Sequence, residues 1–154
     1  MKMDTYSVME SIDARGRQGA TLYTHIGDDG SAWLEGCRCT ACGTVYAGAR
    51  ASCGHCFARD GLEKIKLGGT GKLYNYTVVY RSYPHIKVPF VAAIVDLDEG
   101  GTIKGNLVGI DPDPATIPFG LPVRVIFRGA EEAIGEQGEG FIAHFFMPAS
   151  EGEK

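Results

Sequence analysis

Hydrophobic and polar residues alternate through most of the second half of the chain, from residue 67 to residue 148. Successive side chains of a β-strand point to opposite faces, so a period of two residues predicts strands, and the Gly and Pro residues between the runs predict turns. Five runs show this pattern: GKLYNYTVVYRS, PFVAAIVDLDEG, GTIKGNLVGI, LPVRVIFRG and GFIAHFFMP. Five short strands without a strong intervening helix fit a small closed barrel.

Three of these runs place apolar side chains on one face of the expected strand. The faces are Val91, Ala93, Val95 and Leu97 in the second run, Val123, Val125 and Phe127 in the fourth, and Phe141, Ala143, Phe145 and Met147 in the fifth. The third run alternates more weakly. We therefore expect a barrel in which at least these three strands have one apolar side.

Residues 1–36 form a mixed lead-in to these elements. Tyr6, Met9 and Ile12 recur at three-residue intervals before Gly16, which predicts a short helix near residues 5–14. The segments TLYTHI and SAWLEG flank GDDG and predict a small hairpin. Two interpretations remain open: the lead-in packs on its own chain, or the helix and Trp33 form a docking surface.

All five cysteines lie between residues 37 and 66. Cys39 and Cys42 form one C-x2-C pair, and Cys53 and Cys56 form a second pair after ten intervening residues. A tight turn at each pair aims two sulfurs at one point, and a connecting hairpin brings both pairs into one tetrahedral four-thiolate site. Gly43, directly after the first pair, allows a sharp turn that points N–H groups at the sulfurs. The spacing therefore predicts a metal site on these four cysteines.

The expected metal is zinc, because nothing else in the sequence suggests electron transfer, although four sulfurs also suit iron. Four cysteine ligands close the coordination shell, whereas a catalytic zinc keeps an open position, so we expect a structural site. A module of this size has too small a core to fold alone, and metal binding then provides part of its folding free energy.

Two alternatives concern the same cysteines. The tetrapeptide CGHC, residues 53–56, also suits thiol–disulfide exchange, but that chemistry needs a preceding buried strand and a following helix, and neither flanking segment resembles one.

We expect Cys37 and Cys39 to point to opposite faces of a strand, so that only one shares a site with Cys42, and the spacing favours Cys39. A catalytic role for Cys37 in a zinc enzyme stays open.

Composition narrows the class of protein further. The chain has 154 residues, 44% of them hydrophobic, and a formal net charge of −4, which is unlike the basic footprint of a general nucleic-acid binder. No run resembles a signal peptide or approaches the ~18 apolar residues of a membrane span. Paired cysteines in a reducing compartment more often hold metal than form disulfides. We expect a cytoplasmic protein with a lead-in at 1–36, a ribbon at 37–66, a barrel at 67–148 and a tail at 149–154.

A stand-alone protein that binds single-stranded nucleic acid is the alternative function. An aromatic face with basic neighbours can stack bases, although the same tyrosines can pack within the barrel. The residues concerned are Tyr74, Tyr76 and Tyr80, expected on one side of the first barrel strand beside Lys72, followed by Arg81, Tyr83 and Lys87. The chain contains no HExxH or GxSxG motif, and we assign it no catalytic residue.

The order of these segments carries a family resemblance over roughly residues 31–148. The cysteine ribbon is followed by GGTGKLYNYTVVYR, PFVAAIVDLDEG, GNLVGID, FGLPVRVIF and FIAHFFMP. This order resembles the acyl-CoA-associated family that joins a rubredoxin-like zinc ribbon to an OB fold. The departures are the additional Cys37 and the lack of Pro after the first cysteine of CGHC.

The resemblance implies a non-catalytic partner of a thiolase-superfamily enzyme that acts on acyl-CoA. The thiolase would supply the nucleophilic cysteine and the acid–base residues, while the small subunit stabilises the hetero-oligomer and helps to shape the acyl-CoA channel. Contact with CoA would need cations or backbone N–H groups for its phosphates. The candidates for this contact are Arg81, Lys87, Arg124 and Arg128.

Overall fold

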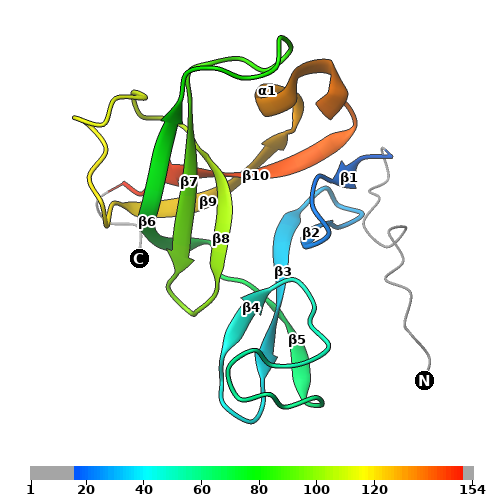
Figure 1. Ribbon diagram of the computed structural model, residues 1–154. Helices are drawn as coiled ribbons and strands as arrows, with labels where there is room; N and C mark the ends of the chain where they lie inside the picture. The colour runs from blue at the N-terminus through cyan, green and yellow to red at the C-terminus, as the bar shows by residue number, and fades with distance from the viewer. Residues whose placement is uncertain (1–15, 151–154) are drawn as a thin grey trace.

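The computed structural model describes residues 16–150, which fold mainly as β-structure (Figure 1). A closed barrel lies beside a smaller sheet that carries the cysteines. A short helix, α1 (Glu131–Ile134), and a 3-10 turn, η2 (Gly135–Gly138), connect the last two barrel strands. No helix within residues 16–150 is long and apolar enough to cross a membrane.

Each of the five alternating runs contains one barrel strand, as predicted. The strands are β6 (Thr70–Val79), β7 (Phe90–Leu97), β8 (Thr102–Leu107), β9 (Pro122–Gly129) and β10 (Phe141–Pro148). The β6, β7 and β8 strands pair antiparallel in succession, β8 pairs parallel with β10, and β10 pairs antiparallel with β9. Pairing of β9 with β6 closes the ring, so the predicted five-stranded OB-type barrel is confirmed.

The apolar face predicted for β7 lies in the barrel core. Val91, Ala93, Val95 and Leu97 are all at most 5% exposed. On β9, Val123 is buried, and Val125 and Phe127 pack against the same core.

The face predicted for β10 is not the one that fills the core. Phe146, from the opposite face, is fully buried in the core, whereas Phe141 is 37% exposed. Phe145 is buried too, but outside the core cluster, where it lines a cavity with Ala133 of α1. Because both faces of β10 are covered at its centre, the period of two residues alone does not identify the inner face.

His144 also belongs to the inner face of β10. Its Nε2 lies 2.7 Å from the backbone oxygen of Lys104 on β8, and its ring packs edge-on against Phe146. Burial lowers the pKa of His144, so the neutral imidazole is the form that the fold favours. Its role as a structural residue follows from this packing.

A β-bulge in β6 separates the three tyrosines that were expected on one face. Leu73 pairs with Val95 and Asn75 with Ile94, so Tyr74 is an extra residue in its strand. Tyr76 consequently packs against the core, and its hydroxyl donates to the backbone oxygen of Ile117 at 3.0 Å. Tyr74 and Tyr80 remain exposed, so the expectation of one shared aromatic face was wrong.

The smaller sheet is built around one long strand. Its strands are β2 (Thr24–Ile26), β3 (Ala32–Cys39), β4 (Val45–Ala47) and β5 (Leu62–Lys66), while β1 (Gln18–Gly19) pairs with β10. The antiparallel pairing of β2 with β3 forms the predicted hairpin. The predicted helix near residues 5–14 lies outside the described residues. The β3 strand runs through residues 36 and 37, and the division of the chain at this point stays a prediction.

The ribbon and the barrel share one core. Leu34 of the lead-in, Val45 of the ribbon and Leu67 at the start of the barrel segment belong to the same buried cluster as the barrel residues, and the N–H of Leu67 donates to the carbonyl of Leu34 at 2.8 Å. A Cβ at Gly36 would collide with the backbone oxygen of Tyr46 and with the side chain of Leu67. The absence of a side chain at Gly36 therefore lets β3, β4 and the connection to the barrel pack together.

Candidate metal centre

The sulfur atoms of Cys39, Cys42, Cys53 and Cys56 converge at the end of the ribbon. The four Sγ atoms all lie within 4.8 Å of one another, and both the Cys39–Cys56 and Cys42–Cys53 pairs are 3.6 Å apart. A tetrahedral zinc with bonds of about 2.3 Å separates its sulfur ligands by about 3.8 Å. The donor set and its spacing fit such an ion, so this cluster can bind a metal as the sequence predicted.

Two matching turns hold the sulfurs in place. In the first, the N–H of Cys39 donates to the carbonyl of Thr44 at 2.9 Å, and the N–H of Gly43 donates back to the carbonyl of Cys39 at 2.8 Å. The second turn repeats this pattern from Cys53, with Ala58 and Phe57 in the equivalent positions, at 2.8 Å and 3.0 Å. Each C-x2-C pair thus forms a knuckle whose backbone fixes the direction of both sulfurs.

The two knuckles differ at the residue after the second cysteine. Gly43 has φ +80°, and Phe57 has φ +62°, the only positive φ of a non-glycine residue in the described range 16–150. Glycine adopts this left-handed conformation without strain, whereas a residue with a Cβ does not. The Phe57 side chain is 80% exposed, so packing within the chain offsets little of that cost.

We expect opposite effects from exchanging the residue types at these two positions. Gly43→Ala lowers the stability of the folded protein by about 1 kcal/mol, because no heavy atom lies within 4 Å of the new Cβ and only the backbone conformation is penalised. Phe57→Gly raises it by up to about 1 kcal/mol, since the strain is relieved. Thermal unfolding of the metal-loaded variants measures both shifts, and shifts of the same sign would contradict this explanation.

Hydrogen-bond donors surround two of the four sulfurs. The Thr44 hydroxyl lies 3.1 Å from the Cys42 sulfur, and this contact is the largest cause that lowers the pKa of Cys42, to about 5. The Cys53 sulfur accepts a hydrogen bond from the N–H of His55 at 3.4 Å and lies 3.3 Å from the hydroxyl of Tyr46. The contact with Tyr46 is the main reason that the pKa of Cys53 is lowered. Donors of this kind favour the thiolate, which is the form that binds metal.

Sequence reasoning missed Tyr46 and Thr44 as neighbours of the site. Both follow the first C-x2-C pair within four residues, but a hydroxyl at that distance in sequence has many possible partners. Pairing of β4 with β3 places Tyr46 opposite Cys37 in the sheet, and its hydroxyl then reaches across to the second knuckle. This contact between the two knuckles depends on the fold and has no signature in the spacing.

Cys37 lies beside the cluster but is not part of it. It is 3% exposed and shares the buried side of β3 with Cys39, while Arg38 between them is exposed. The expectation that Cys37 and Cys39 point to opposite faces was wrong, because residues two apart in a regular strand share a face. Burial raises the pKa of the Cys37 thiol, which disfavours the thiolate that a nucleophile would need.

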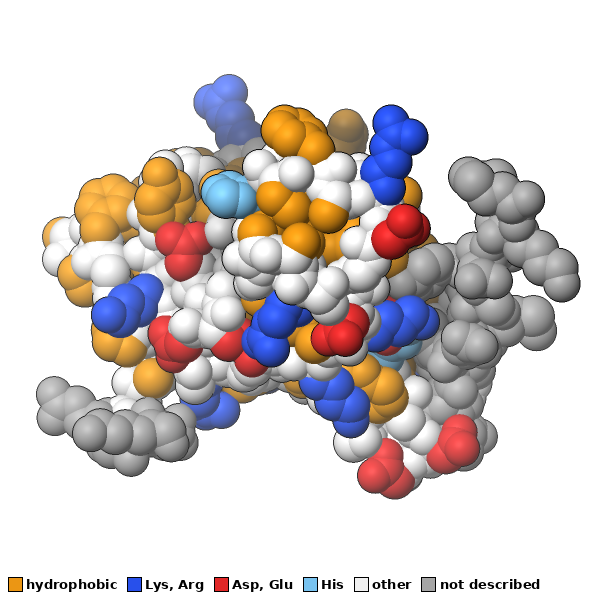
Figure 2. Space-filling view, turned by 90° about the horizontal axis from the view of Figure 1, so that it is seen from below, with side chains coloured by type: hydrophobic (Ala, Val, Ile, Leu, Met, Phe, Trp, Pro, Cys, Tyr) orange, Lys and Arg blue, Asp and Glu red, His pale blue; other side chains and the backbone are white. Residues whose placement is uncertain are grey.

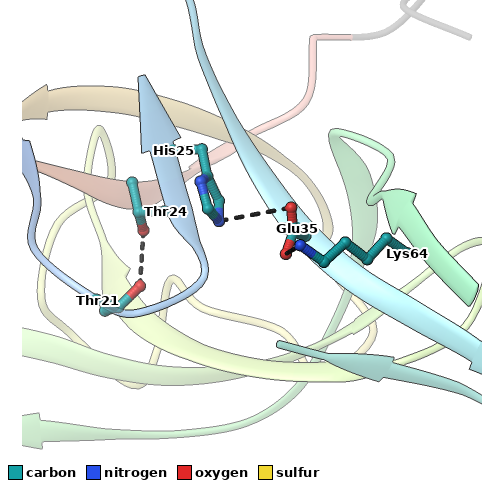
Figure 3. Close-up of polar contacts among 5 residues, drawn as sticks. All are labelled: Thr21, Thr24, His25, Glu35 and Lys64. Atoms are coloured by element: carbon teal, nitrogen blue, oxygen red, sulfur yellow. Dashed lines mark hydrogen bonds and ion pairs between the residues drawn. The ribbon is translucent and has the colours of Figure 1, made fainter. Parts of the chain in front are cut away.

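A polar cluster on the lead-in hairpin lies next to the ribbon (Figure 3). The Nε2 of His25 on β2 is 3.6 Å from the Glu35 carboxylate on β3, and the Nζ of Lys64 on β5 is 3.8 Å from the same carboxylate. Trp33 stacks on His25, and the Nζ of Lys66 lies 4.3 Å from the centroid of the Trp33 ring. Trp33 therefore has packing partners on its own chain, but the predicted helix of the docking-surface interpretation lies outside the described residues, so both interpretations of the lead-in stay predictions.

The four cations proposed for CoA contact lie on two elements. Arg81 and Lys87 are on the segment between β6 and β7, and Arg124 and Arg128 are on β9. Lys87 and Glu132 line a cavity of about 260 Å³, and Arg128 forms a 3.1 Å ion pair with the same Glu132. Arg128 is therefore paired with a carboxylate that borders the same cavity as Lys87, while Arg124 lies near the start of β9.

Charges of both signs mix on the face that Figure 2 shows. Lysine, arginine, aspartate and glutamate side chains alternate over it without a single-sign region. The exposed Tyr74 and Tyr80 are separated by the inward-turned Tyr76. Tyr74, Tyr76 and Tyr80 therefore do not form the continuous aromatic face on which single-stranded nucleic acid would stack.

The fold and the cysteine cluster define a four-cysteine ribbon joined to an OB-type barrel. The model of the family described as "ChsH2, C-terminal OB-fold domain" matches residues 64–128. The chain is 38% identical over 117 residues to a "DUF35 domain-containing scaffold protein" of Methanocaldococcus jannaschii, which covers 75% of this chain and 81% of that protein. The protein belongs to the DUF35 family, and the resemblance found in the sequence is confirmed.

Several similar proteins carry enzyme names, and the chain covers different shares of their lengths. A solved structure titled "Ltp2-ChsH2(DUF35) aldolase" is similar with a TM-score of 0.60 and 32% identity, over 77% of this chain and 86% of that chain. The "Benzoylsuccinyl-CoA thiolase subunit BbsA" of Geobacter metallireducens is 29% identical over 53% of this chain and 55% of that protein. The "Probable enoyl-CoA hydratase alpha subunit" of Thermomonospora curvata is 36% identical over 64% of this chain, but only 33% of that protein.

Proposed function

We propose that this chain is a non-catalytic, zinc-binding subunit of a cytoplasmic complex in which a thiolase-superfamily enzyme acts on acyl-CoA. The chain stabilises the complex and helps to shape the acyl-CoA channel, and the partner supplies the catalytic residues. Within this class, the specific candidate is thiolysis of benzoylsuccinyl-CoA in aromatic degradation, with this chain as the small subunit.

The observation that carries the proposal is the match to a scaffold protein across 81% of that protein's length, at 38% identity. Two further similarities support an acyl-CoA enzyme as the partner: one similar structure is an Ltp2-ChsH2(DUF35) aldolase, and one relative is a benzoylsuccinyl-CoA thiolase subunit. The four-sulfur cluster supports a structural role for the metal, because four thiolates leave no open coordination position.

Zinc is the metal that we propose for the cluster. It prefers tetrahedral thiolate sites and has no redox chemistry, which suits a scaffold, whereas the same ligands suit iron if the chain transfers electrons. Elemental analysis of the native, untagged protein distinguishes the two. Iron in place of zinc would overturn the choice of metal without affecting the proposed partner.

For CoA, we propose that Lys87 and Arg81 contact the phosphates, with Arg128 and Arg124 nearer to the barrel wall. Lys87 lines the cavity beside α1, and Arg128 already pairs with Glu132 in the free chain. Phosphate recognition needs cations that are not already neutralised, which favours the pair on the β6–β7 segment.

Co-purification from the native host tests the proposed function. We expect the chain to elute in a complex with a thiolase-superfamily enzyme and removal of the chain to lower the activity of that enzyme. A hydratase or an aldolase in that complex would keep the scaffold role and replace the proposed partner. A lone monomer whose removal leaves the cognate thiolase fully active would overturn the proposal.

A further inference from the structure

The hydroxyl of Tyr46 contacts a cluster sulfur that belongs to the other knuckle. Thr44 reaches Cys42 within its own turn, and the backbone N–H of His55 reaches Cys53 within its own turn. Tyr46 instead comes from β4, after the first knuckle, and its oxygen lies 3.3 Å from the sulfur of Cys53 in the second. It therefore joins the two halves of the site.

The direction of this hydrogen bond follows from the chemistry of the cluster. A metal-bound cysteine is a thiolate, which accepts hydrogen bonds and cannot donate one. Tyr46 must then be the donor. The Cys53 residue is only 1% exposed, so water does not compete strongly for this sulfur.

Arg50 holds the ring of Tyr46 from one side. Its guanidinium carbon lies 4.2 Å from the ring centroid, within the range of a cation–π contact. The backbone of Tyr46 is fixed independently by the pairing of β4 with β3, opposite Cys37. The ring position is thus set by the sheet on one side and by a cation on the other, and both contacts are independent of the metal ligands.

We propose that Tyr46 is a positioning residue of the metal centre: supported by Arg50, it hydrogen-bonds the Cys53 thiolate, holds the second knuckle against the first and slows release of the metal. The inference rests on the proposed zinc site. Groups that hydrogen-bond metal ligands commonly change metal affinity by about 10–100-fold when they are removed. A donor that spans both knuckles also orders Cys53 in the metal-free chain, so its loss weakens capture as well as retention.

Zinc transfer to the chelator 4-(2-pyridylazo)resorcinol tests this inference on the full chain loaded with zinc. Tyr46→Phe keeps the ring and its Arg50 contact but removes the hydroxyl, and we expect zinc release about 10-fold faster than from the wild type. Arg50→Gln should accelerate release by about two- to fivefold. Tyr80→Phe is the matched control. It makes the same chemical change at an exposed residue outside the metal centre and should not change the rate.

Mapping of N-ethylmaleimide labelling by mass spectrometry separates a local role from general loosening. In Tyr46→Phe, labelling of Cys53 should rise relative to labelling of Cys42. Release within twofold of the wild type, or an equal rise at all four cysteines, would overturn the role of Tyr46 while leaving the zinc site intact. A wild-type chain that retains no stoichiometric zinc would overturn the metal proposal and this inference together.

Discussion

Replacement of Cys53 by serine is expected to abolish stoichiometric metal binding and to unfold the ribbon. Cys53 is 1% exposed, supplies one of the four converging sulfurs and lies within hydrogen-bond distance of the Tyr46 hydroxyl and the His55 N–H. Structural zinc contributes about 10–16 kcal/mol of apparent binding free energy in small zinc modules, and that energy is folding energy. Elemental analysis and amide hydrogen exchange over residues 37–66 measure the two effects.

Cys37→Ser is the matched control for this result. Cys37 is almost as buried, at 3% exposure, and lies two residues from Cys39, but its sulfur is outside the cluster. We expect this variant to keep one metal ion per chain and slow exchange in the ribbon, with a cost of about 1–3 kcal/mol for the buried hydroxyl. Loss of metal from Cys37→Ser, with retention by Cys53→Ser, would show that the four ligands are wrongly assigned.

The shared core gives the metal an effect beyond the ribbon. Leu34, Val45 and Leu67 pack in the same cluster as Leu73 and Val95 of the barrel. We expect loss of the metal to release Val45, the ribbon residue of this cluster, and so to expose one flank of the barrel core. The metal centre therefore supports the barrel. Under the proposed function, this keeps rigid the barrel surface against which a partner would pack.

The sequence was most informative where a structural rule acts over short distances. Two C-x2-C pairs predict converging sulfurs because each pair needs only one tight turn, and Gly43 takes the positive φ that this turn requires. The barrel strands were equally predictable, because alternation and turn residues act within each run. The parallel pairing of β8 with β10 was less predictable, because it joins strands that are far apart in the sequence.

The features that were wrongly predicted or missed depend on distant parts of the chain. The inner face of β10 depends on its distant neighbours: Phe146 packs over Gly105 of β8, whereas Phe145 borders a cavity together with Ala133 of α1. The bulge at Tyr74 shifts the faces of β6 by one residue, and no residue in that run marks its position. Likewise, the partner of the Tyr46 hydroxyl is seven residues away in sequence and belongs to the other knuckle.

Truncation of Phe146 to alanine should cause the largest loss of stability among substitutions in the barrel. Phe146 is fully buried, and its ring edge packs closely over Gly105, where a Cβ would lie 2.9 Å from the ring. Replacement of a buried Phe by Ala costs about 3–5 kcal/mol, because it removes apolar contacts and leaves a cavity that the barrel closes only partly. Chemical denaturation of the metal-loaded protein measures this loss.

Two further phenylalanines turn the same experiment into a test of the β10 assignment. Phe119→Ala should cost less than about 1 kcal/mol, because this side chain is 69% exposed. Phe145→Ala should fall between these values: its side chain is buried, but it borders an existing cavity of about 260 Å³ and lies outside the core cluster. A greater loss from Phe145→Ala than from Phe146→Ala would mean that the predicted face, with Phe141 and Phe145, is the inner one after all. The order Phe146, Phe145, Phe119 is expected because Phe146 packs over Gly105 of β8, Phe145 borders a cavity and Phe119 is exposed.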